Sequence, residues 1–236
     1  QDAKTSLEFF AVLNRVLKTL PSRPGEAALI AQFDQIGVGP NATFDVDQLS
    51  AAQRKGLQRA MDDAEQIIKA STQRTIASFN GWMISKDIGR YDYRYMHRAA
   101  VVKGGYGNVP EESLYPAAVF DSNGNLLDGS NEFRITFKAG QLPPVNGFWS
   151  LSAYQLTSAK LAPNSINRYS IGNLTQGISY NPDGSLTLIL QHEVPKHNQT
   201  NWLPLPKGHF MLVMRLYEPQ QKVLDNEWIL PSIERL

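Results

Sequence analysis

The sequence predicts an α+β protein in which a helical N-terminal region, residues 1–78, is packed on an antiparallel β-sandwich formed by residues 79–236. Two observations lead to this fold class. Before residue 79, apolar residues recur at spacings of three and four, which is the period of an amphipathic helix. After it, short β-prone runs alternate with frequent Gly, Pro and Asn turn signals, which is typical of antiparallel sandwiches and barrels.

The helical region is expected to contain three helices. Thr5 and Glu8 have the spacing of a capping box that would start the first helix, and Pro21 would end it. A second, shorter helix is expected over residues 26–36, because Gly37 just after it can adopt the left-handed conformation that commonly ends a helix.

The third predicted helix is long and runs from about residue 50 to residue 77. Ser50 and Gln53 have the spacing to cap its N-terminus. If this helix acts in oligomerisation or as a scaffold, its apolar face should be exposed as a stripe. That face carries Leu57, Met61, Ala64 and Ile68.

Six β-prone runs follow in the second half of the chain. In residues 133–138, apolar residues alternate with Arg134, Thr136 and Lys138, which share the opposite face. Both faces of residues 210–217 are mostly apolar, which predicts a central strand. The predicted strands are residues 97–102, 117–121, 133–138, 147–154, 186–191 and 210–217.

Two local predictions follow from these strands. Asn123 and Gly124 form the turn signal of a β-hairpin, because both can adopt positive φ angles. If the strands fold into two facing sheets, the side chains of Phe137, Trp149 and Leu212 should fill the interior.

Composition narrows the possible functions. The chain has 236 residues and no cysteine, which excludes disulfides, thiolate catalysis and cysteine-bound zinc or iron–sulfur centres. A formal net charge of +1 gives no reason to expect a nucleic-acid partner. No run reaches the roughly 18 apolar residues that span a bilayer. We expect a periplasmic or secreted protein, since the lack of cysteine is compatible with export, and a cytoplasmic location is the alternative.

Several motifs occur in a characteristic order along the second half of the chain. They lie at residues 106–112, 127–131, 142–150, 167–172, 181–185 and 201–204. In this respect residues 100–236 resemble the bacterial family called domain of unknown function 1214. The resemblance implies a jelly-roll-like β-sandwich with helices at its side, and it implies no established reaction. In larger proteins this domain usually follows a domain numbered 1254, so the chain is either a naturally short member or a fragment of a two-domain protein.

The candidate ligand-binding residues come from these motifs, in which Asn and Arg stand beside aromatic residues. Such sets can orient a polar ligand through a few convergent hydrogen bonds. They are equally typical of loops held by buried Asn side chains and by an Arg bound to backbone carbonyls. If the loops at residues 167–169 and 201–202 meet, they would form a pocket wall. The candidates are Asn131, Trp149, Tyr154, Asn167, Arg168, Tyr169, Asn201 and Trp202.

A second candidate surface lies at residues 90–98, which combine tyrosine and arginine. In an extended segment Tyr91, Tyr93 and Tyr95 would share one face and could stack on a sugar ring, while the arginines grip an anion. Alternatively the tyrosines fill a seam in the fold, and the arginines pair with acidic neighbours.

The sequence gives little support for a metal or cofactor, and we expect neither. His192 and Glu193 are adjacent, so on a regular strand they point to opposite faces, and His197 follows only after Pro195. A calcium loop at residues 121–132 fits only half of the EF-hand spacing, because its sixth position is Leu126 instead of glycine.

We therefore expect a non-catalytic module that binds a polar ligand, carbohydrate-like or a small anion, or that assembles with a partner. The partner would be a missing upstream domain or a second copy. The alternative is a hydrolytic or acid–base enzyme acting on a carbohydrate-like substrate through a pair of carboxyl groups. The acidic residues close enough in sequence to supply such a pair are Glu111, Glu112, Asp121, Asp128 and Glu132.

Overall fold

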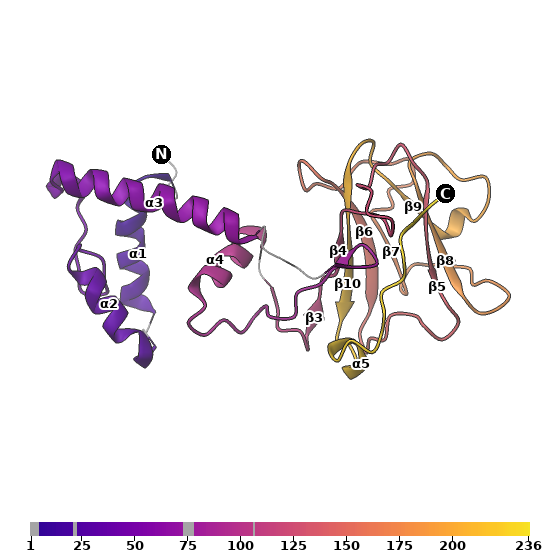
Figure 1. The fold of residues 1–236 in the computed structure, drawn as a ribbon, viewed down its shortest axis with the longest axis horizontal. Coiled ribbons are helices and arrows are strands. Elements are labelled where there is room, and N and C mark those ends of the chain that lie inside the picture. The colour runs from indigo at the N-terminus through magenta and orange to yellow at the C-terminus, as the bar shows by residue number, and fades with distance from the viewer. Residues whose placement is uncertain (1–4, 21–22, 73–77, 106) are drawn as a thin grey trace. The chain divides into compact units, whose positions relative to one another are not determined.

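The computed structural model describes residues 5–20, 23–72, 78–105 and 107–236 (Figure 1). The chain divides into two compact units, which we call the helical unit (Gln1–Gln73) and the sandwich unit (Arg74–Leu236). The sequence placed this division after residue 78. The predicted α+β class is confirmed, because helices near the N-terminus precede two mostly antiparallel sheets. The packing of the helical region on the sandwich stays a prediction.

The helical unit contains the three predicted helices. They are α1 (Glu8–Thr19), α2 (Ala27–Asp34) and α3 (Ala51–Thr72), with short 3₁₀ turns at Pro24–Glu26 and Val46–Gln48. The predicted capping box at Thr5 does not start α1, which begins at Glu8 after Leu7 in the N-cap position. Gly37 has a φ of 76°, the left-handed conformation that was predicted for it.

Helix α3 begins with the predicted capping box. The Gln53 backbone N–H donates to Ser50 Oγ over 3.2 Å, and the Ser50 N–H donates to Gln53 Oε1 over 3.0 Å. Residues 73–77 of the predicted helix lie outside the described residues. Leu57 is buried, and Met61 and Ile68 are half-buried, so the fully exposed stripe expected of an oligomerisation helix is not present at these positions.

One predicted strand is wrong. Residues 97–102 lie within helix α4 (Tyr95–Gly104), which begins with a bond from the Arg98 N–H to the Arg94 carbonyl. The apolar and β-branched residues of this run favour a strand only where a pleated, half-buried surface is available. No described strand pairs with this segment, and the helix satisfies its backbone locally.

Two sheets form the sandwich unit. The larger sheet has the order β1 (Ser78–Phe79), β2 (Trp82–Met83), β4 (Ala117–Ala118), β10 (Phe210–Tyr217), β6 (Trp149–Gln155) and β7 (Ser170–Gly172), and β3 (Ser113–Leu114) also pairs with β10. The smaller sheet has the order β11 (Glu234–Arg235), β5 (Phe133–Phe137), β8 (Leu186–Gln191) and β9 (Trp202–Pro204). All pairs are antiparallel except β8 with β9. A short helix, α5 (Gln221–Leu224), follows β10. The jelly-roll connection of these strands stays a prediction.

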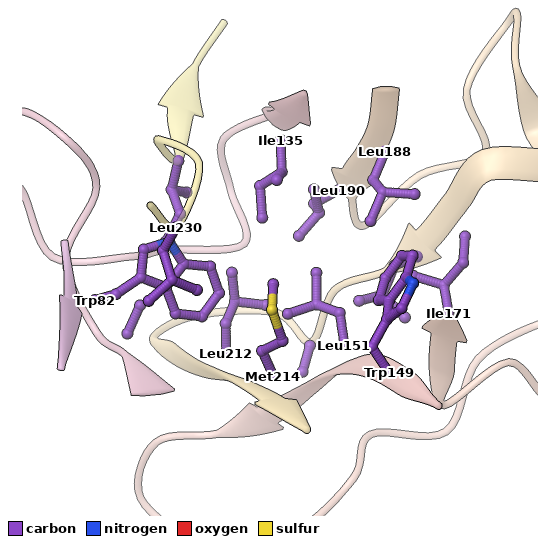
Figure 2. Packing of buried hydrophobic residues seen from close by; sticks show 14 of the residues in the cluster. Trp82, Ile135, Trp149, Leu151, Ile171, Leu188, Leu190, Leu212, Met214 and Leu230 are labelled. Atoms are coloured by element: carbon purple, nitrogen blue, oxygen red, sulfur yellow. The ribbon is translucent and has the colours of Figure 1, made fainter. Parts of the chain in front are cut away.

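The core lies between the two sheets. Figure 2 shows Ile135, Leu188 and Leu190 of the smaller sheet pointing towards Leu151, Leu212 and Met214 of the larger one. The three side chains predicted to be inside are buried, with Phe137 1%, Trp149 3% and Leu212 0% exposed. Burying each such side chain contributes about 1.5–3 kcal/mol. Strand β10 is central, as predicted, because it pairs with β6 along its whole length and with β3 and β4 on its other side.

Candidate functional site: a groove at the edge of β5

A groove of about 670 Å³ lies beside strand β5 in the sandwich unit. One wall is formed by β5 and the turn after it, and the other by the C-terminal segment that precedes β11. Asn80, in the turn between β1 and β2, also lines the groove. The described residues that line it are Asn80, Arg134, Thr136, Phe137, Lys138, Gln141, Ile229, Leu230, Pro231, Ser232 and Glu234.

The C-terminal wall is held in place by hydrogen bonds to its backbone carbonyls. The Asn80 side-chain amide donates to the Leu230 carbonyl over 3.0 Å, and the Trp82 indole N–H donates to the Pro231 carbonyl over 2.8 Å. Trp82 is itself buried in the core, so its indole is a rigid anchor. Because the carbonyls of Leu230 and Pro231 already have these hydrogen-bond donors, residues 229–232 are held in place away from β5. The groove is therefore preformed.

The other wall exposes part of a sheet edge. Strand β11 pairs with β5 only at Arg134 and Phe133, and the Leu236 N–H donates to the Glu132 carbonyl over 2.9 Å. In an antiparallel ladder every second residue turns its N–H and C=O towards the same neighbour. Because Glu132 faces the side of β11, Thr136 also faces that side. No backbone hydrogen bond joins Thr136 to residues 229–232 within the described chain, so its backbone groups open onto the groove.

The groove carries more positive than negative charge. The Arg134 Nε donates to Glu234 Oε2 over 2.7 Å, and both side chains are about half exposed. Lys138 is exposed at the end of β5, and no acidic side chain within the described residues pairs with it. Arg134 and Thr136 share the outward face of β5, as their alternation predicts, and Lys138 follows directly after the strand.

The two loops that were predicted to meet do so, through Arg168. Its guanidinium NH1 donates to the carbonyl oxygens of Thr200 and Trp202 over 2.9 and 2.8 Å. The Arg168 backbone N–H donates to Asn164 Oδ1, and this bond closes a turn between residues 164 and 168. Arg168 therefore binds backbone carbonyls, which is the structural role that the sequence left open.

Asn201 and Trp202 are also bound within the protein. Asn201 is 2% exposed; its side chain accepts from the Ser179 N–H and donates to the carbonyls of Ser179 and Thr187. The Trp202 indole donates to the Gln191 carbonyl over 2.9 Å. Every strong hydrogen-bonding group of these two side chains has an internal partner, so they stabilise the β8–β9 region.

The other predicted residues are distributed over strand β6, the loop before β7 and the segment before β5. Trp149 packs on Phe137 in the core with ring centroids 5.2 Å apart, the Tyr154 hydroxyl accepts from Arg215, and Asn131 Oδ1 accepts from Arg235. Asn167 and Tyr169 are exposed on their loop. None of the eight predicted residues lines the groove. The alternation in residues 133–138, which predicts that Arg134 and Lys138 share one face, is the signal for the groove that the sequence contains.

Residues 90–98 are not the extended surface that was predicted. Asp92 has a φ of 46°, and α4 begins at Tyr95, so the three tyrosines do not share the face of a strand. The arginines pair with acidic neighbours, which was the alternative: Arg90 with Glu111 and Arg94 with Asp87, both at 2.9 Å. The hydrogen bond from Arg90 lowers the pKa of the Glu111 carboxyl.

The segment at residues 121–132, which fits only half of a calcium-loop pattern, is explained by local hydrogen bonds. The Asp121 carboxylate accepts from the N–H groups of Asn123 and Asn125 over 2.8 and 2.9 Å, in a hairpin turn where Gly124 has a φ of 84°. The predicted hairpin is confirmed by the bridge between Phe120 and Leu126, but of the two predicted turn residues Gly124 has a positive φ and Asn123 does not. Burial alone would raise the pKa of Asp121, but the hydrogen bonds outweigh it and the pKa is lowered. Among the described residues, no three His, Asp or Glu side chains are grouped to hold a metal.

The sequence motifs in the second half of the chain can now be compared with a known family. The family model "Protein of unknown function (DUF1214)" matches residues 112–221. The resemblance is confirmed over this segment, which runs from just before β3 to the start of α5. It contains the β5 wall of the groove, whereas Asn80 and the C-terminal wall lie outside it.

Two solved structures are similar to the chain. The VPA0106 protein from Vibrio parahaemolyticus is 26% identical, with a TM-score of 0.62 over 89% of this chain and 51% of its own. A putative uncharacterized protein from Burkholderia cenocepacia is 13% identical, with a TM-score of 0.36 over 90% of this chain and 49% of its own. The chain thus spans about half the length of each. No curated protein matches. No described helix is both long and apolar enough to cross a membrane.

Proposed function

We propose that the chain is a non-catalytic module that binds a small polar ligand carrying a negative group, carbohydrate-like or a simple anion, in the groove beside β5. One observation carries this proposal: two positive side chains, Arg134 of β5 and Lys138 directly after it, line the same wall of the groove. The opposite wall is apolar at Ile229, Leu230 and Pro231.

The dimensions and chemistry of the groove fit such a ligand. A volume of about 670 Å³ lies within the roughly 300–1,000 Å³ typical of small-molecule sites. Arg134 presents a guanidinium, which binds carboxylate and phosphate groups through paired hydrogen bonds. The apolar wall would contact the C–H faces of a ring or chain, and the Asn80 amide and Ser232 add polar groups.

The same residues argue against the hydrolytic alternative at this place. Glycoside hydrolysis generally requires two carboxyl groups across the scissile bond. The described lining residues include one carboxylate, Glu234, and it is paired with Arg134. Binding without chemistry is therefore the function that the groove supports best.

The experiment is a titration of the full chain with glucuronate, citrate, phosphate and neutral glucose, followed by calorimetry and by amide chemical shifts. We expect the acidic ligands to bind and to shift amides of residues 134–138 and 229–232, while glucose does not bind. Lys138→Gln should weaken binding about fivefold, since it removes one of two positive groups, in line with about 1 kcal/mol per charge-assisted contact. Lys207→Gln, an exposed lysine outside the groove, is the matched control. No binding by any acidic ligand would overturn the proposal.

A second candidate function is assembly with another domain. Phe9, Val16 and Leu20 in and just after α1 are exposed, and exposed apolar side chains grouped on one element often mark an interface. The chain also corresponds to about half of the VPA0106 protein, so a domain matching the other half is the partner this candidate requires. Light scattering of the chain alone separates this from self-association: a monomer fits the partner-domain candidate, and a dimer contradicts it.

A further inference from the structure

We propose that the groove also binds a short acidic peptide, which lies extended along the open edge of β5 as an added strand. This inference rests on the proposed function, because it assigns a ligand class to the same groove. A peptide can use the one feature of the groove that a sugar or a simple anion leaves unused, namely the backbone of a sheet edge.

The pairing of β11 determines where such a strand would bind. Glu234 lies opposite Arg134, and the hydrogen bond from the Leu236 N–H to the Glu132 carbonyl shows that alternate pairs, 132 with 236 and 134 with 234, exchange hydrogen bonds. The next position of this kind on β5 is Thr136. If β11 were longer, Ser232 would lie opposite Thr136, but the backbones of these two residues are not hydrogen-bonded. A ligand residue opposite Thr136 can therefore exchange two backbone hydrogen bonds with it.

Two hydrogen bonds keep residues 229–232 from pairing with the open edge of β5. The carbonyls of Leu230 and Pro231 accept hydrogen bonds from Asn80 and Trp82. If residues 229–232 paired with β5 as a longer strand, these two hydrogen bonds, of 3.0 and 2.8 Å, would break. The edge therefore stays available beside a fixed apolar wall.

The charges and the strand period define the ligand sequence. Side chains on an added strand alternate between the two faces, and a residue opposite Lys138 lies on the outward face with it. An acidic residue there pairs with Lys138. The next ligand residue lies opposite Phe137 and faces the apolar side, and the third lies opposite Thr136. In antiparallel orientation this reads, from the N-terminal end, as acidic, apolar, polar.

The probe is the blocked tripeptide acetyl-Asp-Leu-Thr-amide, titrated into the isotope-labelled full chain. We expect the backbone amides of Thr136 and Lys138 to shift. Methylation of the peptide's threonine nitrogen removes the hydrogen bond to the Thr136 carbonyl and should weaken binding at least tenfold. Methylation of its leucine nitrogen is the matched control, because that N–H points away from β5, and it should change affinity less than threefold.

The outcomes separate this inference from the proposed function. If glucuronate or citrate binds the groove while the tripeptide does not, the peptide inference is wrong and the anion-binding function stands. Equal weakening by the two methylations, or shifts that map away from β5, also contradicts the inference. If neither the anions nor the tripeptide binds, both proposals are wrong.

Discussion

The helical unit and the sandwich unit differ in how much apolar surface each removes from water. Among the described residues of the helical unit, the hydrophobic residues that are buried are Leu7, Val38 and Leu57, at 3–8% exposure. In the sandwich unit, by contrast, the inward residues of β5, β8 and β10 are buried to 1% exposure or less. Stability scales with buried apolar area, so the sandwich unit should tolerate changes at its surface that the helical unit does not.

A buried polar side chain also stabilises the helical unit. Asn14 of α1 is buried; its amide donates to the carbonyls of Gly37 and Ala42, and its Oδ1 accepts from the Gly39 N–H. These bonds tie α1 to the loop after α2. The comparison teaches that one unit is held mainly by packing between sheets and the other by a few contacts, one of them a buried amide.

The largest expected effect is in the sandwich core. Phe137→Ala removes a buried ring that packs on Trp149, and it should lower the free energy of unfolding of the sandwich by about 3–5 kcal/mol. Leu57→Ala in α3 leaves a smaller, shallower cavity and should cost about 2 kcal/mol. Urea unfolding followed by tryptophan fluorescence for the sandwich and by helical circular dichroism measures both. Equal losses would contradict the contrast between the units.

A somewhat smaller effect is expected from Asn14→Ala. The substitution leaves two carbonyls and one N–H without their partner, which costs about 1–3 kcal/mol when the groups stay dry. The loss should appear in the circular-dichroism transition of the helical unit, while the fluorescence transition of the sandwich is unchanged. Asn164→Ala, which removes an amide contact within a sandwich loop, is the comparison variant. A shift of the fluorescence transition by Asn14→Ala would show that the units do not unfold independently.

The pH dependence of the sandwich should come in part from Asp121. Its folded-state pKa is lowered, so its ionised form stabilises the fold above the unfolded pKa of about 4, and this contribution is lost as the pH falls through the folded pKa. In Asp121→Asn the group no longer titrates. Between pH 5 and pH 2 the variant should therefore lose less stability than the wild type. Parallel curves in urea unfolding would contradict this assignment.

Particular elements show what could be predicted from the sequence. The alternation in residues 133–138 and the apolar faces of residues 210–217 predicted β5 and β10, because the strand period is imposed locally by burial of one or both faces. The strand predicted at residues 97–102 was wrong, because strand formation depends on a partner that the local sequence does not encode. Arg168 and Asn201 stand beside aromatic residues in the sequence motifs. In the structure their side chains donate hydrogen bonds to backbone carbonyls, and the sequence does not show which carbonyls these are.

The groove was beyond prediction for a similar reason. It joins Asn80, strand β5 and the segment before β11, and Asn80 and Leu230 are 150 positions apart in the sequence. Only the alternation of Arg134 and Lys138 was visible beforehand. The shape of the groove follows from where β11 stops pairing, and that depends on the long-range bonds of Asn80 and Trp82.

The smallest expected effect on stability tests whether the well-packed sandwich leaves its groove free for function. Glu234→Gln removes the carboxylate that pairs with Arg134, and because both side chains are about half exposed, the free energy of unfolding should fall by less than about 1 kcal/mol. The same change frees the guanidinium and raises the positive charge of the groove, so citrate should bind about three to ten times more tightly at low salt. Calorimetry at 20 and 300 mM salt measures this gain, which should shrink at the higher salt. Weaker citrate binding in Glu234→Gln would mean that the carboxylate positions Arg134 for the ligand and does not compete with it.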